Sequence, residues 1–167
     1  VGLDLLASIR PDGTGDAAAL GPRDGESWED AFFRLLLDHV EPRMAEGPAT
    51  FLTHWPTPQA ALARRDPADG RAALRFELYA AGMELANAFD ELTDEAEQRA
   101  RFAHDVAERV RLYGDDEAWP ADEDFLEAVG RMPAGSGIAL GWDRLVMLAT
   151  GARAIEDVLW LGPFPYR

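Results

Sequence analysis

The stretch that says most about this chain is Gly137-Ile138-Ala139-Leu140-Gly141-Trp142-Asp143-Arg144. Small residues occupy alternate positions in its first half, so a flat group can lie against the backbone if this half is a strand. An Asp-Arg pair then opens an apolar run that is typical of a helix, and an arginine placed there can grip a phosphate in a bidentate fork. The stretch therefore predicts a nucleotide-binding strand that is followed by a phosphate clamp.

Charge and composition exclude several classes of function. The chain has 167 residues, enough for one domain, and its 31 acidic and 16 basic residues give a net charge of −15. This excess disfavours a nucleic-acid backbone as partner, which makes tRNA unfavourable. Every basic residue is an arginine and cysteine is absent, so lysine and thiolate nucleophiles, disulfides and cysteine zinc sites are excluded. No apolar stretch reaches the ~20 residues of a membrane span, and we expect a cytoplasmic protein without a membrane partner.

The order of the expected elements indicates an α+β fold. Residues 1–26 are rich in Gly, Asp, Pro and Ala and predict a loop-rich lead-in. Strands with helices between them favour a mostly antiparallel sheet flanked by helices over residues 27–167. The five tryptophans are expected to pack in the core. The expected elements are a helix from Ser27 that Pro42 ends or kinks, a strand at 50–55, two strands within 75–91 around Ala81-Gly82, helices at 94–113 and 122–132, a strand at 136–140 and a helix at 143–150.

An acidic hairpin within 75–94 holds the remaining chemistry. Glu77 and Glu84 are a pair of hard oxygen ligands of the kind that Mg²⁺ prefers, and Glu91 could receive an ammonium group. Glu84 and Asn87 have opposite parity in a regular strand, so they can serve one pocket only if a bulge lies near Leu85-Ala86. We therefore predict that bulge. The alternative interpretation is that these carboxylates are solvated charges on a sheet face.

Taken together, the segments resemble the second half of the catalytic domain of class II lysyl-tRNA synthetases. They are more similar to the elongation factor P–(R)-β-lysine ligases, paralogues of those synthetases that lack an anticodon-binding domain. Ala139 separates the two groups, because it replaces the middle glycine of motif 3 in lysyl-tRNA synthetases. The likeness covers about residues 27–167. It rests on Pro48–Leu52, Trp55-Pro56, Gln59–Ala63, Arg75–Tyr79, Glu84–Asn87, Glu91–Asp94, Glu97–Arg99, Met132-Pro133 and Ser136–Gly141.

The resemblance implies an AMP-forming ligase that uses ATP and Mg²⁺. Its amino-acid substrate would be (R)-β-lysine or lysine, activated as an adenylate and passed to a lysine of elongation factor P. A change of one methyl at Ala139 fits a pocket remodelled for a β-amino acid. By resemblance, Glu77 and Glu84 hold Mg²⁺ and, with Gly141 and Arg144, bind ATP; Arg144, Glu77 and Glu84 are catalytic; Asn87, Phe89, Glu91, Gly137 and Ala139 contact the amino acid.

Two departures from the family pattern lead to alternatives. Ala88 stands where the family usually has glycine, which would strain a positive φ. Motifs 1 and 2 are not found, so only the second half of the domain is expected, with weak or no activity alone and a possible homodimer in the full-length protein. The chain would then be a fragment, a split gene product or a degenerate paralogue. The alternatives are a fragment of a class II lysyl-tRNA synthetase and a non-catalytic ligand-binding paralogue.

Overall fold

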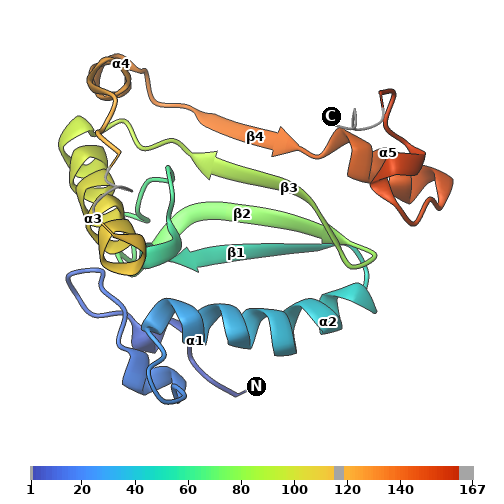
Figure 1. Cartoon of the computed structure of the whole chain (residues 1–167), viewed down its shortest axis with the longest axis horizontal. Helices are drawn as coiled ribbons and strands as arrows, with labels where there is room; N and C mark the ends of the chain where they lie inside the picture. Colours follow the sequence, from blue (N-terminus) through green and yellow to red (C-terminus); the bar gives the residue numbers. More distant parts are fainter. Residues whose placement is uncertain (1, 115–118, 162–167) are drawn as a thin grey trace.

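A four-stranded antiparallel sheet forms the centre of the computed structural model, which describes residues 2–114 and 119–161 (Figure 1). The strands lie side by side in the order in which they occur in the chain. Alternating side chains and the turn at Ala81-Gly82 specify this meander. The expected α+β fold is thereby confirmed. The strands are β1 (Thr50–Pro56), β2 (Ala72–Ala80), β3 (Met83–Asp90) and β4 (Ser136–Leu140).

Helices border the sheet on three sides (Figure 1). One helical rod runs beside β1, two helices lie at one end of the sheet, and α5 follows β4 at the other end. Polar caps begin three of them: Ser27 forms a reciprocal capping box with Asp30, and Asp94 and Asp122 accept backbone N–H groups. The helices are α1 (Trp28–Leu35), α2 (Glu41–Ala45), α3 (Glu95–Tyr113), α4 (Glu123–Arg131) and α5 (Trp142–Thr150).

Pro42 does not end the first helix, which was one of the two effects expected of it. Helical backbone continues through it, because a π-helical turn, η3 (Leu36–Val40), joins α1 to α2. The wider turn lets the N–H of Glu41 reach the carbonyl of Leu36, and Pro42 then occupies the first turn of α2, where its missing N–H costs least. The turn matters for the site, because the residue that follows it, Glu41, contacts the Tyr79 hydroxyl.

The main hydrophobic core lies between the helical rod and β1. Trp28, Phe32 and Leu36 pack against Trp55 of β1, with Trp28 stacked on Phe32 at 5.2 Å between ring centroids. The lead-in has only two single-turn 3-10 helices, η1 (Leu6–Ser8) and η2 (Ala17–Leu20). It nevertheless contributes to this core, since Ile9 and Leu20 are 5% and 3% exposed.

The expectation that all five tryptophans pack in the core is also wrong. Trp28 and Trp55 are buried, but Trp119, Trp142 and Trp160 are 64%, 67% and 97% exposed. Aromatic side chains bury large apolar areas when a partner is present, so these three lie on faces that the described part of the chain does not cover. No helix in the described ranges is long and apolar enough to cross a bilayer.

Candidate active site

The predicted bulge is present in β3. Leu78 pairs with Ala86 and the next residue of β2, Tyr79, pairs with Glu84, so Leu85 is an extra residue in the ladder. The extra residue reverses the parity of β3 at this point and brings Glu84 to the same face of the sheet as Asn87. This face, which also carries Glu77 opposite Asn87, is called the carboxylate face below.

Glu77 lies at the centre of the carboxylate face and is 5% exposed. Its Oε1 accepts from Arg75 Nη2 at 2.5 Å and from Asn87 Nδ2 at 3.3 Å, while its Oε2 accepts from the Tyr79 hydroxyl at 2.7 Å. Burial, with the bond to Glu77, raises the pKa of Tyr79 above its ordinary value, so the phenol stays protonated and donates. A carboxylate this buried is stabilised because Arg75, Asn87 and Tyr79 all donate to it.

Glu84 is the more accessible carboxylate. Arg144 in the first turn of α5 donates to the Glu84 carbonyl at 2.8 Å, and its guanidinium lies 3.6 Å from Glu84 Oε2. Burial, followed by the negative charge of Glu77, raises the pKa of Glu84 although Arg144 opposes the shift. Two like charges therefore share this part of the face, and Arg144 lies beside Glu84 at its rim.

The pair of carboxylates fits a divalent cation. A cation would offset the repulsion by Glu77 that adds to the effect of burial on Glu84, and Glu84 Oε2 is held only by a 3.6 Å ion pair. Glu77 has both oxygens engaged and could add only a remaining lone pair. Among the described residues no group of three or more His, Cys, Asp or Glu could hold a metal. Mg²⁺ commonly takes one or two carboxylates and completes its shell with water and phosphate oxygens.

The glycine pattern of β4 makes room for Glu91. Phe89 of β3 pairs with Gly137, and a Cβ built on Gly137 would lie 2.5 Å from Glu91 Oε1. Glu91 therefore rests directly on the glycine backbone, beside Phe89. Asn87 pairs with Ala139, whose methyl consequently projects from the same face. A Cβ on Gly141 would meet Arg144 Cδ at 3.4 Å, an ordinary van der Waals contact, so Arg144 lies close to this glycine at the end of the strand.

The replacement of glycine by Ala88 causes no strain. Ala88 lies within regular extended β3, paired with Phe76 on one side and Ile138 on the other, and it is 5% exposed. Its methyl points to the face opposite the carboxylates, since the parity of β3 is regular from Ala86 onward.

Sequence reasoning missed three members of this site. Arg75 lies on the same face as Glu77, and a parity argument over Arg75–Glu77 could have found it. The same parity argument, extended by two residues, could have placed Tyr79 on this face. Glu41 lies 3.4 Å from the Tyr79 hydroxyl, and no sequence signal places it there, because the π-helical turn before it is not readable from residue spacing.

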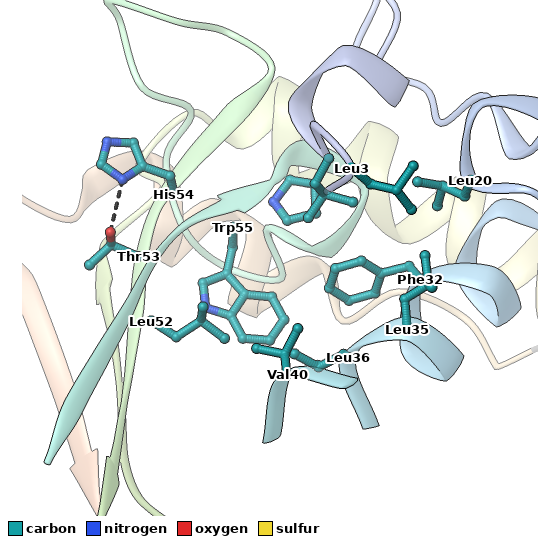
Figure 2. Close-up of a pocket in the computed structure, with 12 residues that line it drawn as sticks. Leu3, Leu20, Phe32, Leu35, Leu36, Val40, Leu52, Thr53, His54 and Trp55 are labelled. Atoms are coloured by element: carbon teal, nitrogen blue, oxygen red, sulfur yellow. Dashed lines mark hydrogen bonds between the residues drawn. The ribbon is translucent and has the colours of Figure 1, made fainter. Parts of the chain in front are cut away.

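An apolar cavity of about 150 Å³ adjoins this region between β1 and the helical rod (Figure 2). Leu3, Leu20 and Val40 line it with the core side chains, whereas the His54 ring points away and bonds to Thr53. Trp55 forms one wall, and its indole N–H is buried without a partner among the described residues. The lining is too apolar for a nucleotide, so the cavity is not part of the carboxylate site.

Comparison with known proteins identifies the family. The family described as tRNA synthetases class II (D, K and N) matches residues 33–165. The elongation factor P–(R)-β-lysine ligase of Proteus mirabilis is 46% identical over 138 residues, which are 81% of this chain and 42% of that protein. The lysine–tRNA ligase of an Anaeromyxobacter species (strain K) is 48% identical over 120 residues, 71% of this chain and 23% of that protein. The chain thus spans less than half the length of these relatives.

Proposed function

This chain belongs to the class II tRNA synthetases (D, K and N), and from that membership we propose that it is part of an ATP-dependent ligase that activates a lysine-type amino acid. The observation that carries the proposal is the Leu85 bulge, which gathers Glu77, Glu84 and Asn87 on one face beside Gly137. Residues on this face or at its rim would bind the four groups that the reaction brings together: the ATP phosphates, the metal ion, and the carboxylate and distal amine of the amino acid.

Each group has one proposed role. Arg144 grips the ATP phosphates from the start of α5, and Gly141, which lies against Arg144, contributes to the same ATP site. Glu84, with Glu77 beside it, binds Mg²⁺, which supplies charge neutralisation for the phosphates. Asn87 contacts the amino acid, Phe89 and Ala139 border its stem, and Glu91 on Gly137 receives the distal ammonium.

The proposed reaction has two steps. A carboxylate oxygen of the amino acid attacks the α-phosphorus of ATP, the bond to the β-phosphate oxygen breaks, and pyrophosphate leaves. The amine of a lysine on elongation factor P then attacks the acyl carbon, an amide forms, and AMP leaves as the amine loses a proton. Since no residue of this chain forms a covalent bond, catalysis rests on positioning and charge neutralisation.

Different features of the chain support the proposed amino-acid substrate and the proposed acceptor. Ala139 in place of the motif 3 glycine favours (R)-β-lysine, and the net charge of −15 opposes a tRNA. These features support transfer to elongation factor P. A lysyl-tRNA synthetase is the second candidate, because relatives of both kinds match at similar identity.

Two observations support a requirement for more polypeptide than this chain. Within the described ranges β4 pairs with β3 alone, and the opposite face of the sheet exposes Phe51 and Ile138 at 61% and 62%. A hollow of about 490 Å³ lined by Phe76, Ala88 and Ile138 lies over that face. We propose that the active enzyme covers these surfaces with the part of the family fold that carries motifs 1 and 2.

Calorimetric titration with L-lysine, (R)-β-lysine and norleucine tests the binding half of the proposal. Norleucine retains the carboxylate and stem of lysine but lacks the distal amine that Glu91 would receive. We expect both lysines to bind at least about tenfold more tightly than norleucine, as expected for a charge-assisted contact. Equal affinity for all three would remove Glu91 from the site.

A further inference from the structure

Arg75 is the most heavily engaged cation of the carboxylate face. Its side chain is 12% exposed. Its Nη1 donates to the Gln59 carbonyl at 2.6 Å and its Nη2 to Glu77 at 2.5 Å, while its Nε donates to Asn87 Oδ1 at 3.3 Å. Its guanidinium lies 4.0 Å over the Trp55 ring. Few positions remain open to a side chain held at so many points, so Arg75 is a fixed reference for its neighbours.

These contacts decide which end of the Asn87 amide faces which neighbour. Arg75 Nε–H is only a donor, so it takes the amide oxygen, and the Glu77 carboxylate is only an acceptor, so it takes the amide nitrogen at 3.3 Å. The reversed amide would place N–H against N–H and oxygen against carboxylate. Asn87 is thereby fixed with its Nδ2 toward Glu77 Oε1, and the second N–H of this nitrogen remains to donate to a ligand.

We propose that Arg75 is a positioning residue that fixes Asn87 as a hydrogen-bond donor, so that the site takes a ligand with an acceptor at this point: the carboxylate of the amino acid. This deepens the proposed function and rests on it only for the identity of the ligand. The buried pair of Arg75 and Glu77 then acts through Asn87 rather than on the substrate itself. Lysine cannot replace the arginine, because an ammonium offers a point charge and not a planar fork.

The chain offers a direct probe of this arrangement, because Asn87 is its single asparagine. Protein labelled with ¹⁵N only at asparagine shows one backbone amide and one side-chain amide in a proton–nitrogen NMR spectrum. The side-chain pair reports the hydrogen bonds of Asn87. The backbone signal reports that β3 is formed, so a variant that fails to fold is recognised in the same spectrum.

In the wild-type chain we expect two separate side-chain proton signals whose exchange with water is slowed. In Arg75→Lys, with the backbone signal retained, we expect that exchange to accelerate by roughly tenfold to a hundredfold, the range that charge-assisted hydrogen bonds are worth. The matched control is Arg71→Lys, since Arg71 pairs with Asp69 in the loop before β2 and has no contact with Asn87. It should leave the side-chain signals unchanged.

Adding L-lysine separates this proposal from the proposed function. The donor role is supported if lysine shifts the Asn87 side-chain signals and cadaverine, which lacks the carboxylate, does not. Loss of this lysine-dependent shift in Arg75→Lys would show that the donor role depends on Arg75. If Asn87 is protected and depends on Arg75 but lysine shifts nothing, the ligand is wrong while the positioning holds. An unprotected wild-type amide, or one indifferent to Arg75→Lys, would overturn the positioning role.

Discussion

At the scale of single residues, the absence of a side chain is as important as its presence. Gly137 has no Cβ, and the carboxylate of Glu91 occupies the volume that a Cβ would take, 2.5 Å from Oε1. A contact under about 3 Å between non-bonded carbon and oxygen is not tolerated in a packed structure, so one atom at residue 137 controls where Glu91 lies. The sequence predicted both residues as substrate contacts, but the contact between them is visible only in the fold.

Replacing Gly137 with alanine should therefore displace Glu91 and weaken lysine binding. We expect a loss of at least about tenfold in affinity, with little change in norleucine affinity, because only the distal contact moves. Isothermal titration calorimetry measures both. Gly135→Ala is the control, since a Cβ there would meet nothing closer than 3.8 Å. Unchanged lysine affinity in Gly137→Ala would show that Glu91 does not hold the distal amine.

At the scale of elements, the β2–β3 hairpin carries the site and is closed by a strained turn. Ala81 has a φ of 50° and Gly82 a φ of 76°, as a two-residue turn between twisted strands requires. Alanine in the left-handed region costs about 1–2 kcal/mol, a cost that glycine avoids. This turn fixes the register on which the Leu85 bulge depends.

Ala81→Gly should therefore stabilise the chain by about 1 kcal/mol, as measured by urea unfolding at pH 7. The neighbouring Ala80→Gly is a matched control. Ala80 lies in regular β2 with an ordinary φ, and there the extra freedom of glycine should destabilise by about 0.5–1 kcal/mol. The prediction fails if both variants are destabilised to the same extent.

An ion-pair cluster joins α3 to the segment that precedes β2. Glu97 Oε1 accepts from Arg65 at 3.0 Å and from Arg101 at 2.6 Å, and Arg101 also donates to the Ala63 carbonyl. Burial alone would raise the pKa of Glu97, but bonds to Arg101 and Arg65 outweigh it and hold the pKa below its ordinary value of 4.5. Because the folded-state pKa is lowered, the stabilisation is fully present above pH 4.5 and is lost as pH falls through the folded value.

Glu97→Gln should consequently destabilise the chain by about 1 kcal/mol at pH 7, and the difference from wild type should shrink steadily below pH 4.5. Urea unfolding curves at pH 7, 5 and 3.5 measure the trend. Glu127→Gln on α4 is the control, because its pair with Arg131 is exposed on both sides and should contribute almost nothing. A difference that persists unchanged at pH 3.5 would contradict the ion-pair origin.

Elements were predictable where local signals are strong, and contacts were not. The capping residue Asp94 located α3 and the Ala81-Gly82 turn located the hairpin. The bulge near Leu85 followed from strand parity, once Glu84 and Asn87 were assigned to one pocket. The π-helical turn before Pro42 was missed because it depends on tertiary packing of α1 rather than on a residue pattern. Trp142 was misjudged for the converse reason: burial depends on a partner surface, which local sequence does not specify.

At the scale of the whole molecule, the part of the chain that the structure describes leaves the outer edge of β4 unpaired, next to the most informative motif. The bonds from Gly141 to Leu85 and from Glu91 to Gly135 direct the odd-numbered backbone groups of β4 toward β3. By antiparallel geometry, the backbone groups of Ser136, Ile138 and Leu140 then face outward. This edge carries no charge or proline to block pairing, which is unusual for an edge that stays exposed. It agrees with the proposal that further polypeptide completes the site.

Amino-acid-dependent ATP–pyrophosphate exchange tests the central claim most directly. The assay compares this chain alone with the chain supplied with the part of the Proteus mirabilis relative that it does not match, using (R)-β-lysine and L-lysine in parallel. We predict little exchange by the chain alone, and exchange in the mixture that is faster with (R)-β-lysine than with L-lysine. In Ala139→Gly we expect the preference between the two amino acids to shift toward L-lysine by about tenfold, the lower range for one methyl in a pocket. Exchange with neither amino acid in any mixture, from a folded chain that binds lysine, would contradict the proposed ligase and leave a ligand-binding protein in its place.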